Sequence, residues 1–311
     1  MGISLAPALP DSLIVTDRRS AAATLTRQAA LAGFGVAIVS SPFRARFLLQ
    51  ARPLPPVFGD YTNLLLYWNE ALVLGVFALW ALSLLLRPRR VDFGPVALRL
   101  PVLGLVAAAW LSVPFSEDAG LAAFNALTLS GFAALGLYVF NELRDISKLV
   151  PAIAGMIALQ AFVAIPQVLE QKSFGLKGLG ELKLDPAVPG TSILWTNHAP
   201  KLLRAYGLTD HPNILGGLLT ISLLVLASCL VRYREEWLAV LCGGFGLGVA
   251  ALLLTFSRSA GLGLAGGLAV AAVLLVARRH WRALRFRATG HSRSPTRAAR
   301  PSLSPAAARR A

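Results

Sequence analysis

The sequence has few charged residues for its length. Only 14% of its 311 residues are Asp, Glu, Lys or Arg, whereas a soluble domain usually carries about 25%. Apolar side chains take their place, since they make up 56% of the chain and give it a mean hydropathy of +0.63. These values argue against a soluble globular domain and indicate a membrane protein with several spans.

The residues that usually carry metal, disulfide or nucleotide chemistry are also scarce. The two cysteines, Cys229 and Cys242, lie inside apolar runs, so we interpret them as small buried apolar side chains rather than a disulfide pair. The sequence contains no H-E-x-x-H motif, no cysteine ligand pair and no P-loop. We therefore expect no metal site, no cofactor and no nucleotide hydrolysis.

The apolar residues are grouped into runs of about twenty, the length with which a helix crosses a bilayer. The first run is the weakest, because Pro42, Arg44 and Arg46 interrupt it. The sequence predicts an all-α, polytopic membrane bundle of about eight transmembrane helices, at residues 29–49, 64–86, 96–113, 120–140, 149–169, 212–231, 237–256 and 260–277.

Basic residues recur at every second connection. They precede the first predicted span and follow the second, fourth, sixth and eighth, whereas the turn 116–118 on the other side has none. Because Lys and Arg in short loops mark the cytoplasmic side, both termini are predicted to be cytoplasmic. This divides the chain into an N-terminal cytoplasmic segment (1–28), a transmembrane region (29–277) and a basic cytoplasmic tail (278–311) that we expect to be disordered.

The tail accounts for most of the net charge of +15, because it holds ten arginines and no acidic residue. A segment of this kind is typical of nucleic-acid binding. Beside a transmembrane helix it more simply binds the anionic cytoplasmic surface of the membrane. We therefore expect membrane lipids, and no nucleic acid, among the partners of the chain.

The connection from about residue 171 to residue 211 is much longer than the others, and the alternation places it outside. It holds five basic residues that the charge rule does not favour in a translocated loop, namely Lys172, Lys177, Lys183, Lys201 and Arg204. Long loops in compact bundles are usually functional. The sequence therefore predicts that the functional site lies at this outer loop.

Two arginines on the outer side are candidate ligands for an anion. Arg204 lies shortly before the sixth span, and Arg258 lies in the short turn between the seventh and eighth. Both fit an interfacial arginine that reaches lipid headgroups, and both fit a fixed cation that binds a phosphate or diphosphate in bidentate fashion. His211, directly before Pro212, fits either a helix cap or a general base at the water boundary.

The two arginine segments resemble the core of the O-antigen ligase and O-antigen polymerase family. The pattern of that family is Arg-x-x-Gly running into Pro-Asn at a span start, followed at a later span end by Thr-x-Ser-Arg. The matching residues here are Arg204-Ala205-Tyr206-Gly207, Pro212-Asn213 and Thr255-Phe256-Ser257-Arg258. The resemblance extends over residues 202–276, and the earlier spans agree only in number and hydrophobicity.

This resemblance implies a GT-C-like membrane glycosyltransferase of cell-envelope polysaccharide or lipopolysaccharide biosynthesis. The family transfers a glycan from an undecaprenyl-diphosphate carrier to a hydroxyl of a lipid, glycan or protein acceptor, on the outer face of the bacterial cytoplasmic membrane. The resemblance implies Arg204 and Arg258 as ligands of the diphosphate, with Asn213 and Ser257 in supporting positions. It implies neither a metal nor a cofactor.

The chain departs from the family pattern after residue 276. Members continue with further spans and a large outer loop that carries a catalytic histidine, whereas the basic tail follows here. His211 does not match that histidine, so the catalytic residue stays unassigned, with His211 as a weak candidate, and we expect a truncated member or one part of a split enzyme. The alternatives are a transporter of a lipid-linked anionic glycan and a non-catalytic membrane protein.

Overall fold

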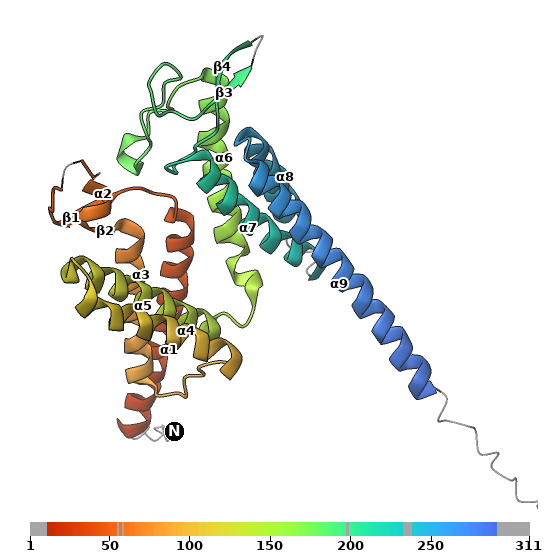
Figure 1. Cartoon of the computed structure of the whole chain (residues 1–311). Helices are drawn as coiled ribbons and strands as arrows, with labels where there is room; N and C mark the ends of the chain where they lie inside the picture. The colour runs from red at the N-terminus through yellow and green to blue at the C-terminus, as the bar shows by residue number, and fades with distance from the viewer. Residues whose placement is uncertain (1–10, 55, 58, 197–198, 233–237, 291–311) are drawn as a thin grey trace, which may run out of the picture. The chain divides into compact units, whose positions relative to one another are not determined.

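The computed structural model describes residues 11–54, 56–57, 59–196, 199–232 and 238–290 (Figure 1). Within these residues, seven helical segments are long and apolar enough to cross a membrane, judged by length and composition. An eighth apolar helix, Leu238–Leu254, is shorter. The prediction of a predominantly helical, membrane-spanning fold is thus confirmed in this general form, while the GT-C-like arrangement stays a prediction.

The helices and strands follow one another along the chain as labelled in Figure 1. The α-helices are α1 (Asp11–Ser40), α2 (Gly59–Thr62), α3 (Trp68–Leu86), α4 (Val96–Ser112), α5 (Ala119–Glu142), α6 (Val150–Glu170), α7 (Pro212–Arg232), α8 (Leu238–Leu254) and α9 (Arg258–Gly290). The strands are β1 (Arg46–Gln50), β2 (Leu64–Tyr67), β3 (Ile193–Thr196) and β4 (Ala199–Leu203). Single 3₁₀ turns, η1 (Val113–Phe115), η2 (Ile146–Leu149) and η3 (Lys177–Leu179), lie between them.

The bounds of the first span were predicted wrongly. The helix α1 begins at Asp11 and ends at Ser40, and Arg46–Gln50 form the strand β1, which pairs antiparallel with β2. The alanine-rich segment after residue 20 favours an early helix, and Pro42 cannot continue it because proline lacks the amide hydrogen.

The second span is also shorter than predicted. Its helix α3 begins at Trp68, where Glu70 accepts a 2.9 Å hydrogen bond from the Tyr67 amide.

The last helix extends beyond its predicted end. The chain divides into two compact units, residues 1–264 and residues 265–311. Among its described residues, the second unit consists of the continuation of α9 from residue 265 to Gly290. The beginning of the predicted disordered tail is therefore helical, and residues 291–311 lie outside the described part of the chain.

Within the first unit, helix pairs bury apolar side chains against one another. The helix α1 packs against α3 and α6, α4 packs against α5, and α8 packs against α6 and α7. One core cluster combines Ala30 and Phe34 of α1, Val76 and Trp80 of α3, and Tyr138 of α5. The Tyr138 ring meets the rings of Phe34 and Trp80 edge to face, with centroids 5.5 and 5.6 Å apart.

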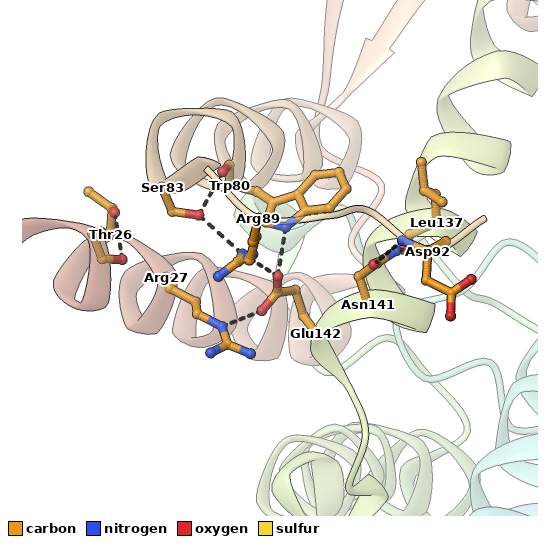
Figure 2. A network of polar contacts seen from close by, with 10 residues as sticks. Thr26, Arg27, Trp80, Ser83, Arg89, Asp92, Leu137, Asn141 and Glu142 are labelled. Carbon is orange, nitrogen blue, oxygen red and sulfur yellow. Dashed lines mark hydrogen bonds and ion pairs between the residues drawn. The ribbon is translucent and has the colours of Figure 1, made fainter. Parts of the chain in front are cut away.

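A buried carboxylate ties the same three helices together (Figure 2). Glu142, the last residue of α5, accepts hydrogen bonds from Arg27 Nε of α1 at 2.5 Å and from Trp80 Nε1 of α3 at 2.7 Å. Arg89, shortly after α3, donates its terminal nitrogen to the same carboxylate. Because a buried charge is costly unless it is paired and hydrogen-bonded, these donors make the position of Glu142 tolerable.

The first prediction concerns this carboxylate. Glu142→Gln removes the charge that two arginines share, so it should lower the free energy of unfolding by about 2–3 kcal/mol, less than for a fully buried ion pair because both arginines are partly exposed. Thermal unfolding in detergent measures the effect. Glu117→Gln, at an exposed position on the opposite turn, is the matched control and should change little. Equal stability of the two variants would contradict the role given to Glu142.

Candidate functional site

Two buried glutamines of α6 hold the segment 206–208 by its backbone. Gln167 Oε1 accepts a 2.8 Å hydrogen bond from the Gly207 amide, and Gln167 Nε2 donates to the Gly207 carbonyl at 2.9 Å. Gln160 Oε1 accepts a 2.9 Å bond from the Leu208 amide. Both glutamine side chains are fully shielded from solvent. Hydrogen bonds from these two side chains to backbone N–H and C=O groups therefore fix the segment that follows Arg204 to α6.

Gly207 is required for this arrangement. Its φ of +59° lies in the left-handed region, which a residue with a Cβ adopts only at a cost. A Cβ at this position would also overlap the Oε1 atom of Gln160. The glycine of the Arg-x-x-Gly pattern thus lets the backbone turn directly against the glutamine.

The long loop that precedes Arg204 is organised around a second buried carboxylate. Glu181 accepts hydrogen bonds from the amides of Phe174, Gly175 and Leu176, at 2.5, 2.7 and 2.6 Å. It also accepts a 2.8 Å bond from Gln167 Nε2. Glu181 therefore connects the beginning of the loop to the same glutamine that holds Gly207, and the long loop has a fixed path close to α6.

The antiparallel strand pair of β3 and β4 determines where Arg204 lies. Ile193 lies opposite Leu203, and Leu194 lies opposite Leu202. Arg204 follows β4 directly, and its amide donates to the Ser192 carbonyl at 3.4 Å. The Ser192 amide in turn donates to the buried Tyr206 hydroxyl at 2.6 Å. The strand pair thus continues into the segment that carries the first candidate cation.

The half-buried Arg204 guanidinium makes three hydrogen bonds to three different parts of the chain. Its Nε donates to the Thr255 carbonyl at 2.8 Å, one terminal nitrogen donates to Ser192 Oγ at 2.9 Å, and the other donates to Asn213 Oδ1 at 2.7 Å. All three acceptors are uncharged. The bond to Thr255 joins the Arg204 segment to the turn between α8 and α9, as does the 2.9 Å bond from the Ala205 amide to the Leu254 carbonyl.

Arg258 lies on that same turn, as the first residue of α9. Phe256 has a φ of +49°, which reverses the chain within a few residues after α8. The Ser257 amide donates to Thr255 Oγ1 at 3.2 Å, and the buried Ser257 lies just before the helix. Arg258 itself is exposed and forms no hydrogen bond or ion pair with the residues that the structure describes. The two predicted cations therefore belong to segments that are bonded to each other.

The electrostatics of this region leave positive charge without an acidic partner. Burial lowers the pKa of Arg204 from its ordinary value, but an arginine is still charged at neutral pH. Among the described residues no carboxylate bonds to Arg204 or Arg258. The nearest acid in the sequence, Asp210, forms an ion pair with Arg44, which lies just before β1. The arrangement is suited to binding an anion from outside the chain.

His211 is placed as a hydrogen-bond acceptor for the backbone at the start of α7. Its Nδ1 accepts a 3.2 Å bond from the Asn213 amide, and its ring lies 6.2 Å from that of Tyr206. Burial and the nearby charge of Arg204 lower the pKa of His211, so the ring is neutral at pH 7. With Nδ1 accepting, the neutral ring carries its proton on Nε2, which favours the cap interpretation over the general base.

An apolar cavity lies on α6 and α8, close to the glutamines. Its volume is about 350 Å³, and it is lined by Ala158, Ala161, Phe162, Ile165 and Pro166 of α6 and by Leu247 of α8. Pro166 directly precedes Gln167, so the cavity begins within one helical turn of the residue that holds Gly207.

No group of three or more His, Cys, Asp or Glu side chains within the described ranges is arranged to hold a metal ion.

The structure thus brings together four of the five residues singled out from the sequence. Arg204 contacts Asn213, and the turn that it bonds carries Ser257 and Arg258. The fifth, His211, lies beside them but is occupied by a backbone amide. Sequence analysis missed the residues that support them, namely Gln160, Gln167, Glu181, Ser192 and Tyr206. A signal existed for the glutamines, because residues 160, 167 and 171 recur at helical spacing on an otherwise apolar span.

The second prediction tests the link between Gly207 and α6. Gly207→Ala should lower the free energy of unfolding by at least about 1–2 kcal/mol, because the left-handed backbone is unfavourable for alanine and its Cβ overlaps Gln160. The matched control is Gly217→Ala in α7, where a Cβ meets no atom within 4 Å and alanine favours the helix. Thermal unfolding in detergent compares the two. If Gly207→Ala were as stable as Gly217→Ala, or more stable, this turn would tolerate a side chain.

Comparison with protein-family models, with curated proteins and with solved structures gives no significant match for this chain.

Proposed function

We propose that the chain transfers a glycan from an undecaprenyl-diphosphate carrier to an acceptor hydroxyl, as an O-antigen ligase or polysaccharide polymerase does, on the outer face of the bacterial cytoplasmic membrane. The observation that carries the proposal is the hydrogen bond from Arg204 to the Thr255 carbonyl. It joins the two segments whose motifs resemble the family, and each of these segments carries an arginine that bonds to no carboxylate of the described chain.

In the proposed reaction the acceptor oxygen attacks the anomeric carbon of the glycan. The bond between that carbon and the carrier phosphate breaks, and the diphosphate leaves with the electron pair. Arg204 and Arg258 would bind the diphosphate and stabilise the negative charge that develops on it. The first amides of α9 add favourable partial charge at the same place, because the N-terminal amides of a helix have no intrahelical acceptor.

Arg204 is suited to this role by its fixed position. Its three hydrogen bonds to uncharged acceptors hold the guanidinium in place and leave two of its five N–H groups for a ligand. Asn213 and Ser192 would act through Arg204 as positioning residues. Ser257 would set the start of α9 and thereby the direction of Arg258.

The apolar cavity beside α6 supports a lipid-linked substrate. A prenyl chain requires an apolar environment next to the diphosphate site, and the cavity has apolar lining residues within one turn of Gln167. The glycan would extend to the opposite, aqueous side, where the outer loop lies. The acceptor proton has no assigned base, since Nδ1 of His211 is engaged with the Asn213 amide.

The engagement of His211 favours one alternative, a carrier or transporter that binds the same lipid-linked anion without chemistry. Binding requires the two arginines but no base. Both functions predict that the chain binds an undecaprenyl-diphosphate glycan, and only the enzyme releases free undecaprenyl diphosphate. The two are therefore distinguished by turnover rather than by affinity.

The third prediction tests the diphosphate ligands. Arg258→Lys keeps the charge but loses the bidentate geometry, so it should lower the rate of transfer by about a hundredfold. The assay uses native membrane vesicles that hold the full chain together with the acceptor, adds a radiolabelled undecaprenyl-diphosphate glycan, and measures release of undecaprenyl diphosphate. Lys177→Gln removes an exposed charge from the loop that precedes Arg204, away from the proposed site, and it should leave the rate unchanged.

The outcomes separate the hypotheses. Unchanged transfer by Arg258→Lys would remove Arg258 from the site, and a large loss in Lys177→Gln would show that only the general positive charge of the loop matters. If the wild-type chain binds the labelled donor but releases no undecaprenyl diphosphate, the enzyme proposal is rejected in favour of a carrier. If it does not bind the donor, both functions are rejected.

A further inference from the structure

The Glu142 cluster carries more positive charge than its carboxylate can neutralise. Two arginines, Arg27 and Arg89, contact one buried glutamate, and the other donor to that carboxylate is the uncharged Trp80. No second carboxylate among the described residues bonds to either arginine. The cluster therefore has a net charge of +1 by this count.

Both arginines have N–H groups that make no bond within the described chain. Arg27 bonds Glu142 through Nε (Figure 2), and its two terminal nitrogens make no bond within the described chain. Arg89 uses one terminal nitrogen for Glu142 and for Ser83 Oγ at 3.3 Å, which leaves its Nε and its other terminal nitrogen uncommitted within the described chain. The side chains are 51% and 33% exposed. A ligand can therefore reach the free donors.

The aromatic side chains restrict the direction of approach. Trp80 and Tyr138 pack edge to face, and both are buried against the same helices as Glu142. They close the interior side of the carboxylate. The remaining donors of Arg27 and Arg89 thus serve ligands that arrive from the surface of the bundle.

The cluster lies where two apolar helices end. Glu142 is the last residue of α5, and Arg89 follows the end of α3 by a few residues. Further basic residues belong to the same connections, namely Arg87, Arg90, Arg144 and Lys148. The charge pattern predicts that these connections face the cytoplasm, and that leaflet is rich in anionic phospholipids.

We propose that Arg27 and Arg89 form a binding site for the phosphate of an anionic phospholipid headgroup. The guanidinium groups donate to the phosphate oxygens through the N–H groups that Glu142 does not accept from. The acyl chains of the lipid lie along the exposed apolar side chains of neighbouring helices, such as Leu82 and Leu85 of α3. This site is separate from the arginines of the outer loop, and its test does not depend on glycan transfer.

The fourth prediction uses native mass spectrometry of the full chain with phosphatidylglycerol or phosphatidylethanolamine. The wild-type protein should retain phosphatidylglycerol preferentially. Arg27→Gln removes the more exposed cation and leaves Arg89 paired with Glu142, so retention should fall about tenfold, as expected for the loss of charge-assisted hydrogen bonds. Arg90→Gln is the matched control, because Arg90 is exposed on the same connection and makes no described bond. It should retain the lipid as the wild type does.

Glu142→Gln should change lipid retention in the opposite direction to Arg27→Gln. An ion pair that serves only stability predicts no such increase in retention. Removing the carboxylate raises the net charge of the cluster to +2 by the same count, so each folded molecule should retain phosphatidylglycerol more tightly even though its stability is lower. Weaker retention in Glu142→Gln, or equal losses in Arg27→Gln and Arg90→Gln, would overturn the proposal. Displacement of the lipid by millimolar inorganic phosphate would assign the site to a soluble anion instead and would likewise overturn it.

Discussion

The hydrogen bonds from α6 to the backbone of residues 206–208 are the constraint on which the position of Arg204 depends. Water is scarce near the end of an apolar helix, so a backbone that leaves regular secondary structure there needs internal partners. Gln167 satisfies both backbone groups of Gly207, and Gln160 satisfies the Leu208 amide. With these atoms fixed, Arg204 lies within reach of the α8–α9 turn and donates to the Thr255 carbonyl there.

Two buried carboxylates organise the described part of the first unit in different ways. Glu181 is satisfied by three backbone amides and a glutamine, so it orders a loop without any counter-charge. Glu142 is satisfied mainly by arginines, so it joins helices and leaves surplus positive charge at the surface. The first arrangement shapes a path for the chain, whereas the second creates an electrostatic feature that other molecules can recognise.

The hydropathy pattern was sufficient to predict where most of the apolar helices lie, because the bilayer imposes a length that few other structures share. It failed at the end of the first predicted span, where α1 ends at Ser40 and β1 follows, and at the start of the second, where β2 precedes α3, since strand pairing depends on a second segment that hydropathy does not identify. The family resemblance implies that Arg204 and Arg258 act at one site, which stays a prediction, and the structure joins their two segments by the bond from Arg204 to the Thr255 carbonyl. The roles of Gln160, Gln167 and Glu181 were not predictable, because hydropathy averages each span and gives a buried polar residue no partner.

Arg204 and Arg258 differ in how much conformational freedom they have before a ligand arrives. An arginine side chain loses about 2 kcal/mol of rotamer entropy when it is fully immobilised. Arg204 has lost much of this freedom during folding, through its bonds to Ser192, Asn213 and Thr255. Arg258 still has it, because no bond to a described residue holds its side chain. In the proposed site, Arg204 would therefore act as a rigid template for the shape of the anion, and Arg258 as an adjustable clamp whose ordering would set the entropic cost of binding.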